Sequence, residues 1–386
     1  MPYAILALNA GSSSVKFGLY DVEDAGGLRL VMRGTLDEGD TPRLIAKADD
    51  GSTLCDLPLA AGDPQAAVRE LVRWIEEKQY DRELVACGHR IVHGGQDFAD
   101  PVWLTPSAVE AIDELTPLAP LHQRRSLAPV RALTELRPEL PQVGCFDTAF
   151  HHTIEPSVSR YALPLEYEAR GIRRYGFHGL SYEYVAERLA EGGKASKRTI
   201  VAHLGNGASL CAIKDGRSVD TTMGFSALDG LVMGTRCGAI DPGVLLYLLL
   251  EEDMSAKEVQ HLLYEKSGLL GISGISGDMR ALEGSSDPRA RAAIDMFVFR
   301  ASREVAALVN TLGGLDCLVF TAGIGEHSTT VRAAICERLR WLGVKIDQTA
   351  NNAHAGTISI QDATVEVRVI PTDEEIMVAR HTLNLL

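Results

Sequence analysis

The chain has 386 residues, of which 46% are hydrophobic and 23% are charged, and its formal net charge at pH 7 is −14. This length suits about two domains with a large core, and the composition is typical of a soluble globular protein. The acidic balance and the lack of a long basic run argue against nucleic acid as a partner. No apolar run reaches the roughly 18 residues that a membrane span needs, so we expect no membrane association.

The cysteines and the N-terminus both bear on the compartment. Seven cysteines lie far apart in the sequence, and none forms a C-x-x-C pair. The N-terminus lacks the basic region and apolar stretch of a secretion signal. Reduced thiols, and therefore a cytoplasmic location, are expected.

The opening stretch has the pattern of a strand, a turn and a second strand. Ile5–Leu8 is apolar, and Val15–Tyr20 alternates apolar with small or polar residues. Between them, Asn9, Gly11 and three serines provide N–H groups and hydroxyls that can bind phosphate, and Lys16 adds a positive charge. An ordinary hairpin explains the stretch equally well, and the spacing of a Walker-type loop is absent.

Three further elements follow in the first half of the chain. Leu28–Leu36 predicts a third strand, and Asp63–Lys78 has the apolar spacing of a helix. Leu84–Gly95 predicts a buried strand that ends in a glycine-rich loop. Arg90 lies within this apolar context, which is costly unless its charge has a partner. Because arginine is the usual bidentate ligand of carboxylate and phosphate, a functional role is favoured over a structural ion pair.

The middle of the chain adds a carboxylate and a histidine. Pro141–His152 predicts a strand that runs into a polar loop at Asp147. Arg173–Tyr182 predicts a turn that opens a helix at Ser181. His178 lies in this turn and, considered alone, is better explained as a core histidine with satisfied hydrogen bonds.

The second half of the chain repeats the pattern of the first. Thr199–Ile213 matches the opening stretch, and Cys317–Glu326 resembles Val143–Phe150, in each case as a strand that leads into a loop of small residues. Two such units predict a duplicated α/β domain, with the halves facing each other across a cleft that holds a ligand.

Two glycine-rich segments and the last helix complete the pattern. The glycines of Gly224–Gly238 and Gly271–Arg280 indicate backbone close to a ligand or in tight turns. In the last helix, Thr372 and Glu375 predict a capping box, which would explain Glu375 fully. Glu374 has no such explanation beyond a favourable position near a helix N-terminus.

Together these motifs closely resemble the acetate kinase family. Each is weak alone, but the ordered set spans nearly the whole chain and is highly specific. The matching blocks are Asn9–Lys16, Gly88–Gly95, Phe146–His151, Arg174–Gly179, His203–Ser209, Met233–Gly238, Asp278–Arg280 and Thr321–Glu326.

The resemblance implies an α/β fold of duplicated ribonuclease-H-like domains, as in the actin/hexokinase-like superfamily, with a central cleft. Residues 1–150 and a returning helix at 373–386 would form one domain. Residues 151–372 would form a second domain that binds nucleotide and forms a homodimer. The implied reaction is the reversible in-line transfer of the ATP γ-phosphoryl group to acetate, giving acetyl phosphate and ADP. The implied cofactor is Mg²⁺, with Mn²⁺ as a substitute.

The resemblance also implies roles for individual residues. Asn9 and Glu374 would hold the metal, and Asp147, His178, Arg236 and Arg90 would surround the transferring phosphoryl group. The acyl pocket would be lined by Arg90, Val92, Leu121, Phe177 and Ala227. The nucleotide would be held by Lys16, Ser12, His203, Leu204, Gly205, Asn206, Gly207, Asp278, Met279, Arg280, Gly323, Ile324, Gly325, Glu326 and His327.

The chemistry of the implied reaction accounts for these residue types. A carboxylic acid with a pKa of about 4 is ionised at pH 7 and needs no general base. Positioning and charge neutralisation should therefore dominate the catalysis. Arg90 and Arg236 suit the stabilisation of the phosphoryl oxygens, and His178 can donate a hydrogen bond. We expect Asp147 to orient an arginine or hydrated magnesium.

The chain departs from the family pattern at several positions, none of which has a named catalytic role. Gln123 and Arg124 follow His122 where Asn-Pro is usual. Leu180, Tyr182, Ala227, Ala239 and His327 stand where Thr, His, Pro, Asp and Asn are usual. A propionate or butyrate kinase is therefore a close alternative. An actin-like ATPase switch is a distant alternative, because a switch would not need the central arginines and histidine.

Overall fold

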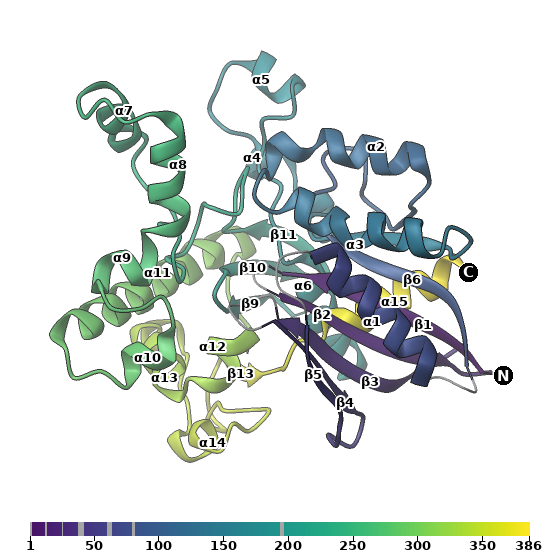
Figure 1. The fold of residues 1–386 in the computed structure, drawn as a ribbon. Helices are drawn as coiled ribbons and strands as arrows, with labels where there is room; N and C mark the ends of the chain where they lie inside the picture. Colours follow the sequence, from purple (N-terminus) through teal and green to yellow (C-terminus); the bar gives the residue numbers. More distant parts are fainter. Residues whose placement is uncertain are drawn as a thin grey trace. The chain divides into compact units, whose positions relative to one another are not determined.

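The computed structural model describes residues 2–11, 14–24, 26–37, 42–59, 64–78, 82–193 and 197–386. The chain divides into two compact units. Unit 1 comprises Met1–Ala149 and Asp373–Leu386, and unit 2 comprises Phe150–Thr372. Each unit is built around one β-sheet with helices packed on it (Figure 1).

Unit 1 contains an eight-stranded sheet with the strand order β5-β4-β3-β2-β1-β6-β8-β7. β1 is parallel to β6, and β6 is parallel to β8, whereas the other neighbours are antiparallel. The strands are β1 (Tyr3–Ala10), β2 (Ser14–Val22), β3 (Leu28–Asp37), β4 (Arg43–Ala48), β5 (Thr53–Pro58), β6 (Glu83–Ile91), β7 (Val102–Trp103) and β8 (Gln142–Phe146). The helices are α1 (Pro64–Lys78), α2 (Pro106–Glu114), a 3-10 turn (Thr116–Leu118), α3 (Gln123–Leu136) and α15 (Glu374–Leu385).

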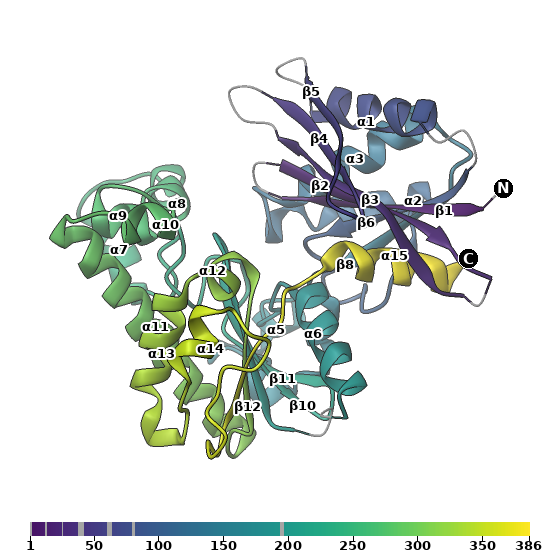
Figure 2. The same ribbon diagram turned by 90° about the horizontal axis from the view of Figure 1, so that it is seen from below.

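The two faces of this sheet carry different helices (Figure 2). Successive side chains of a strand point to opposite faces, so Leu6 and Leu8 of β1 lie on one face, packed with apolar side chains of α1 and α3. The other face carries α15, which packs on β1 and β6. A Cβ added to Gly88 of β6 would lie 2.2 Å from Thr382 Oγ1 and 2.6 Å from Val378 Cγ1. Glycine at this position therefore allows α15 to lie close to the sheet.

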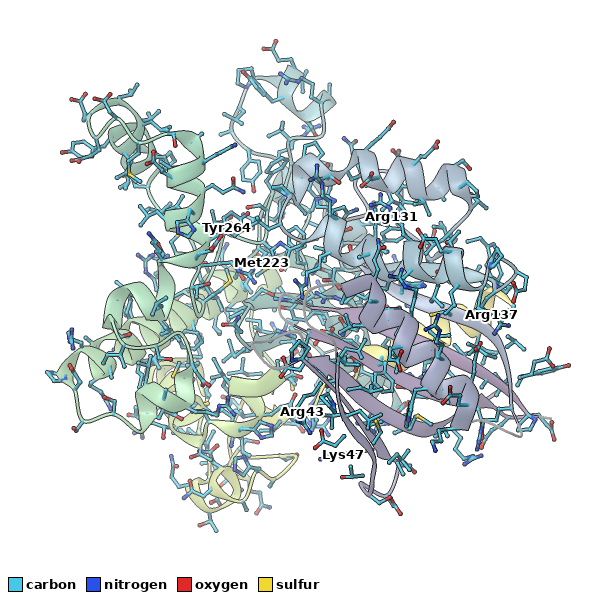
Figure 3. The ribbon with its side chains drawn as sticks, viewed as in Figure 1. Arg43, Lys47, Arg131, Arg137, Met223 and Tyr264 are labelled. Atoms are coloured by element: carbon cyan, nitrogen blue, oxygen red, sulfur yellow. The ribbon has the colours of Figure 1, made fainter. Side chains whose placement is uncertain are left out.

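Several arginines on the surface of unit 1 are paired with carboxylates. Arg131 and Arg137, both labelled in Figure 3, form ion pairs with Asp113 and Glu139. Exposed pairs of this kind contribute roughly 0–1 kcal/mol each. They balance charge on this surface and contribute little to the stability of the fold.

Unit 2 contains a five-stranded sheet with the order β11-β10-β9-β12-β13. The strands are β9 (Thr199–Leu204), β10 (Ala208–Lys214), β11 (Arg217–Thr221), β12 (Cys317–Thr321) and β13 (Glu366–Val369). The α-helices are α4 (Pro156–Ser159), α5 (Leu165–Ala169), α6 (Gly179–Glu191), α7 (Pro242–Leu250), α8 (Ala256–Glu265), α9 (Gly268–Ser273), α10 (Met279–Glu283), α11 (Pro288–Leu312), α12 (Ala322–His327), α13 (Thr329–Arg338) and α14 (Gln348–Asn352). Short 3-10 helices lie at Ala149–Thr153 and Arg340–Leu342.

The two sheets share one topology. In unit 1, β3-β2-β1 are antiparallel and β6 and β8 continue parallel to β1. In unit 2, β11-β10-β9 are antiparallel and β12 and β13 continue parallel to β9. The core of unit 2 forms where Val201 and Val319 pack on Val185 and Leu189 of α6. The predicted repeat is thus a repeat of a whole sheet topology.

Two local predictions from the sequence are wrong. The expected loop after Thr321 is helix α12, which starts at Ala322 with a φ of +63°. The expected capping box at the last helix does not form, because Asp373 is the N-cap and accepts a 2.9 Å hydrogen bond from Ile376 N. The Thr372 hydroxyl instead donates to Ser181 Oγ at 2.8 Å.

All seven cysteines are free thiols, and six of them are buried. Across the described parts of the chain, no helix is both long and apolar enough to cross a membrane.

Candidate active site

In unit 1, three of the predicted site residues lie where neighbouring parallel strands end. Asn9 is near the end of β1, Arg90 is near the end of β6, and Asp147 directly follows β8. Because carboxyl ends of parallel strands meet at one edge of a sheet, residues far apart in the sequence come together there. Asn9 and Asp147 are buried, and the Arg90 side chain is only 14% exposed.

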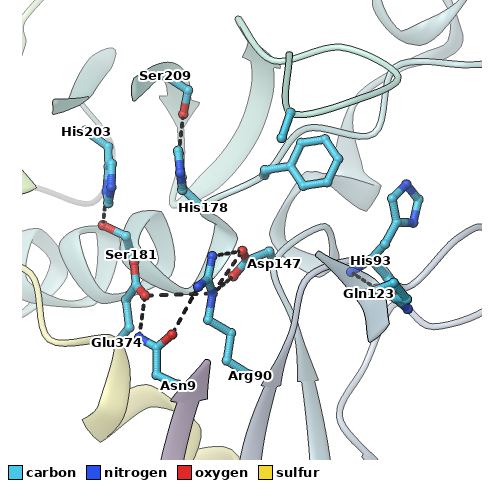
Figure 4. Close-up of polar contacts among 12 residues, drawn as sticks. Asn9, Arg90, His93, Gln123, Asp147, His178, Ser181, His203, Ser209 and Glu374 are labelled. Carbon is cyan, nitrogen blue, oxygen red and sulfur yellow. Dashed lines mark hydrogen bonds and ion pairs between the residues drawn. The ribbon is translucent and has the colours of Figure 1, made fainter. Parts of the chain in front are cut away.

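Arg90 is held by two neighbours (Figure 4). Its Nε donates to both carboxylate oxygens of Asp147 at 2.9 and 3.0 Å, and its Nη2 also donates to Asp147. Its Nη1 donates to Asn9 Oδ1 at 3.0 Å. Burial lowers the pKa of Arg90, but the charges of Asp147 and Glu374 more than offset this effect and raise that pKa above its ordinary value. Arg90 is therefore a fixed positive charge, and Asp147 orients it.

Two carboxylates from the first turn of α15 complete this cluster. The side-chain amide of Asn9 donates to Glu374 at 2.9 Å and to Glu375 at 2.8 Å. Glu374 Oε2 also lies 3.9 Å from Arg90 Nε. Burial raises the pKa of Glu375, the charge of Glu374 raises it further, and Lys16 opposes the rise. Glu375 is thus a site residue that the capping-box prediction missed.

In unit 2, a second group of predicted residues surrounds Gly207. His178 has a φ of +60° and stands directly before α6. A Cβ added to Gly207 would lie 3.2 Å from Arg236 Nη2 and 3.4 Å from His178 Nε2. Arg236 Nη1 donates to the carbonyl of Ala227 at 2.7 Å. Two nitrogen-bearing side chains therefore point to the space that the missing side chain of Gly207 leaves.

His178 and His203 form a stacked pair beside this space. Their ring centroids are 4.1 Å apart with an interplanar angle of 13°. His178 Nδ1 is 2.8 Å from Ser209 Oγ, and His203 Nδ1 is 2.8 Å from Ser181 Oγ (Figure 4). The stacking and both hydroxyl contacts fix the two rings in place.

Residues 4–380 match the Acetokinase family. The chain belongs to the acetokinase family. An acetate kinase from Rhodopseudomonas palustris is 49% identical over 393 residues, covering 100% of the chain and 99% of the relative. An acetate kinase from Nitrobacter hamburgensis is 50% identical over 389 residues, covering 99% and 96%.

Solved structures of acetokinase family members agree in fold. A propionate kinase from Francisella tularensis is 38% identical with a TM-score of 0.92, covering 100% of both chains. The acetate kinase of Porphyromonas gingivalis is 37% identical with a TM-score of 0.87, covering 99% of both chains. The family resemblance and the duplicated α/β fold expected from the sequence are confirmed.

Most of the expected nucleotide residues lie in several segments of unit 2. His203–Gly207 comprises the end of β9 and the turn that leads to β10, and Leu204 is buried and can offer only its backbone. Asp278 caps α10 and pairs with Arg280 at 2.7 Å, while Met279 is buried. The remaining segment, Gly323–His327, lies in α12, where His327 is largely exposed.

The segment at α12 is anchored from two sides. The Glu326 carboxylate accepts hydrogen bonds from Ala322 N at 2.8 Å and Thr372 N at 3.1 Å. Arg332, which is fully buried, donates to the carbonyls of Gly325 at 2.9 Å and Glu326 at 2.7 Å. Sequence reasoning missed Arg332, because an arginine inside a helix is normally exposed.

Of the two nucleotide residues expected in unit 1, Lys16 lies near the start of β2. Lys16 is exposed and pairs in register with Asn9. Ser12 lies outside the described residues. The carbonyl of Gly11 accepts a 2.6 Å hydrogen bond from Arg125 Nε of α3. Arg125 is a further support that the sequence did not indicate.

The expected acyl-pocket residues divide between the units. Val92 and Leu121 lie in unit 1, whereas Phe177 and Ala227 lie in unit 2. Val92 and Phe177 are buried, and Leu121 is exposed.

Gln123 supports the loop that follows β6. It is fully buried, its Oε1 accepts from His93 N at 3.1 Å, and its Nε2 donates to the carbonyls of His93 at 2.9 Å and Ile112 at 3.1 Å. Figure 4 shows Gln123 beside His93. The departure from the family pattern thus places a side-chain amide that fixes the loop next to Val92.

The carboxylates of unit 1 fit a hard divalent cation. Among the described residues, no group of three or more His, Cys, Asp and Glu side chains is arranged to hold a metal. Mg²⁺ at phosphoryl-transfer sites, however, keeps several waters and needs only one or two carboxylates. Glu374 and Glu375 provide two, and their mutual repulsion is what a cation would relieve. Asn9 Oδ1 already accepts a hydrogen bond from Arg90, so the carboxylate oxygens are the better metal ligands.

Proposed function

We propose that the chain is an acetate kinase that transfers the γ-phosphoryl group of ATP reversibly to acetate. The observation that carries this proposal is the complete set of Arg90, His178 and Arg236 in a chain similar over its full length to proteins named acetate kinase. An ATPase switch would not need this set. Acetate is ionised at neutral pH, so the protein has to position and neutralise anions.

The chain's own residues then have distinct roles. Arg90, fixed by Asp147 and Asn9, orients the carboxylate of acetate. Arg236 Nη2 and His178 Nε2 converge beside Gly207 and donate to phosphoryl oxygens. Asp147 has its oxygens occupied by Arg90, so it orients this arginine and does not act as a base.

Nucleotide binding and metal binding are assigned to different segments of the chain. We assign ATP and ADP to His203–Gly207, to Asp278–Arg280 and to α12, together with Lys16 of β2 and with Ser12, which lies outside the described residues. Glu374 and Glu375 would hold Mg²⁺ or Mn²⁺, aided by Asn9. When bound, the cation supplies charge neutralisation for the phosphate oxygens.

A propionate kinase is the second candidate, and one residue favours it. Ala227 stands where the family usually has proline, and the similar protein from Francisella tularensis is named a propionate kinase. A hydroxamate assay with ATP and acetate, propionate or butyrate separates the candidates. We expect acetate to give the highest kcat/KM. A higher value with propionate would transfer the proposal to that acid, and no acyl phosphate with any acid would overturn it.

We also propose that the protein forms a homodimer through α7 and works in the cytoplasm. α7 has the sequence PGVLLYLLL, and none of its residues is buried. Leu246, Tyr247 and Leu250 are 58%, 56% and 69% exposed. A second copy that covers this helix would remove apolar surface from water. Light scattering should give twice the mass of the chain, and Leu246→Glu should give the monomer. The free cysteines support a reducing compartment.

A further inference from the structure

A chain of hydroxyl groups runs from the core of unit 2 to His178. Tyr182 of α6 is fully buried, and its hydroxyl lies 2.5 Å from Ser209 Oγ on β10. The same Ser209 Oγ lies 2.8 Å from His178 Nδ1. Figure 4 shows the second of these contacts. The role assigned above to His178 uses its other nitrogen, Nε2, and leaves this chain unexplained.

The protonated hydroxyl of Tyr182 determines which group donates in each of these two hydrogen bonds. Burial raises the pKa of Tyr182 well above its ordinary value, so the hydroxyl keeps its proton. Among the described residues, Ser209 Oγ is the only partner of that hydroxyl. Because a buried donor without an acceptor is costly, Tyr182 donates and Ser209 accepts.

Ser209 then determines which ring nitrogen of His178 carries the proton. A hydroxyl has a single proton, and with its oxygen accepting from Tyr182, Ser209 directs this proton to His178 Nδ1. A nitrogen that accepts a hydrogen bond carries no proton in the neutral ring, so the proton of His178 resides on Nε2.

We propose that Tyr182 is a positioning residue that acts through Ser209 to hold His178 as the neutral tautomer protonated at Nε2. This nitrogen and Arg236 Nη2 lie 3.4 and 3.2 Å from the point where a Gly207 Cβ would stand. Two donors aimed at one point repel each other unless an anion accepts hydrogen bonds from both. Ser209 holds the His178 ring and the Ala227 carbonyl holds Arg236, so both donors are in place for a phosphoryl oxygen. Only the identity of that oxygen rests on the proposed function.

The alternative is that Tyr182 acts only in packing, and one substitution can separate the role of its ring from the role of its hydroxyl. The Tyr182 ring lies edge-on to His151 and His203, with centroid distances of 5.6 and 6.3 Å. Tyr182→Phe keeps these ring contacts and removes only the hydroxyl. Tyr175 offers a matched control, because it is also buried and its hydroxyl donates to the Gly171 carbonyl at 2.8 Å.

The test uses the intact protein with ¹⁵N-labelled histidine and ¹H–¹⁵N spectra that distinguish the two tautomers, with His178→Ala to assign the signals. We expect wild type to show His178 protonated at Nε2, and Tyr182→Phe to shift the ring toward protonation at Nδ1. In Tyr182→Phe, kcat should fall roughly tenfold because the donor is no longer fixed, while KM for ATP changes little. Tyr175→Phe should leave both the tautomer and kcat unchanged.

Ser209→Ala provides a second check on the same chain. It should change the tautomer as Tyr182→Phe does, and the double variant should lose no more activity than Ser209→Ala alone. Additive losses, or a Tyr182→Phe protein with the wild-type tautomer and kcat, would overturn the proposal. The tautomer is read without any substrate. A wild type that fails to phosphorylate acetate would therefore reject the proposed function and leave this inference to be decided by the spectra.

Discussion

Glu375 accepts a 2.8 Å hydrogen bond from the side-chain amide of Asn9, so this carboxylate belongs to the site and not to the cap of α15. The cap is Asp373, which accepts from Ile376 N. Adjacent glutamates on α15 therefore share one environment. The capping role expected for Glu375 is wrong, because Asp373 has that role, whereas the metal role expected for Glu374 stays a prediction.

Substitutions at Glu375 and Asp373 should give opposite phenotypes. Glu375→Gln removes a part-buried charge whose pKa is raised by desolvation and by Glu374, so the variant should fold at least as stably as wild type. It should also need more Mg²⁺, because one hard oxygen ligand loses its charge. Asp373→Ala should lose about 1 kcal/mol of stability with an unchanged Mg²⁺ requirement. Magnesium titrations of the rate and melting curves on both variants measure this, and the reverse pattern would contradict it.

Arg90→Ala and Arg236→Ala should both lower kcat but differ in stability. Each removes one preorganised donor, which typically costs 10²–10³ in kcat, as an order of magnitude. Arg90→Ala also leaves Asp147 buried without its charge partner, a loss of about 3–5 kcal/mol by analogy with other broken buried pairs. Arg236 is half-buried, so its loss should matter far less to folding.

The double variant Arg90→Ala/Asp147→Asn isolates the two effects on Arg90. Asparagine removes the stranded charge, so stability should recover while kcat stays low. Urea unfolding and steady-state rates on the same preparations provide the comparison. Recovery of kcat together with stability would show that Arg90 is structural only.

The strands that carry site residues at their ends were predictable, because alternation and apolar runs depend on sequence neighbours alone, whereas β4, β5, β7, β11 and β13 were not predicted. β1, β2, β3, β6, β8, β9, β10 and β12 all overlap stretches expected to be strands. The supports of the site were not predictable. Gln123, Arg125 and Arg332 act through backbone carbonyls or N–H groups outside their own helices, and no local pattern shows which carbonyl a polar side chain will meet. Glu375 was misassigned because a cap motif fits its spacing while the fold supplies a different partner.

Glu326 should affect nucleotide binding through the backbone it holds. Its carboxylate accepts from Ala322 N and Thr372 N, and Ala322 has a left-handed φ that its surroundings must maintain. Glu326→Ala should raise KM for ATP about tenfold, an effect of roughly 1.4 kcal/mol, with a smaller change in kcat. Glu326→Gln keeps an acceptor oxygen and should stay close to wild type. Equal effects of both substitutions would instead indicate that the negative charge contacts a ligand.

His89 should make the protein less stable at acid pH. It is fully buried in β6, and burial lowers its pKa to about 4, an effect that Gln142 only partly opposes. In the unfolded chain the pKa is about 6.5. The unfolded state thus binds more protons between these values, and stability is lost as pH falls from about 6.5 to 4. At pH 5 the loss from this residue is about 2 kcal/mol.

Replacing His89 with leucine tests whether this residue lowers the stability of the protein at acid pH. The difference in unfolding free energy between pH 7.5 and pH 5 should shrink by about the same amount in His89→Leu. His151 provides a comparison with a buried histidine whose ring is hydrogen-bonded. Burial also lowers the pKa of His151 to about 4, but its ring nitrogens contact the Ser218 hydroxyl and the Phe177 carbonyl. An unchanged pH dependence in His89→Leu would contradict the expectation.

Ala227 should influence which carboxylic acid the enzyme accepts. Its carbonyl accepts from Arg236, and no described group accepts from its own N–H, so proline at this position costs no hydrogen bond. Proline would add about two carbons of wall, whereas alanine leaves room for an extra methylene, worth about 0.8 kcal/mol or roughly fourfold in binding. Wild type should therefore use propionate nearly as well as acetate, and Ala227→Pro should favour acetate. The measurement is the ratio of kcat/KM for propionate over acetate in both proteins. Because each protein serves as its own reference, a general loss of activity cancels from the ratio. A ratio unchanged by the substitution would show that neighbouring side chains close the gap and that this position does not set chain length.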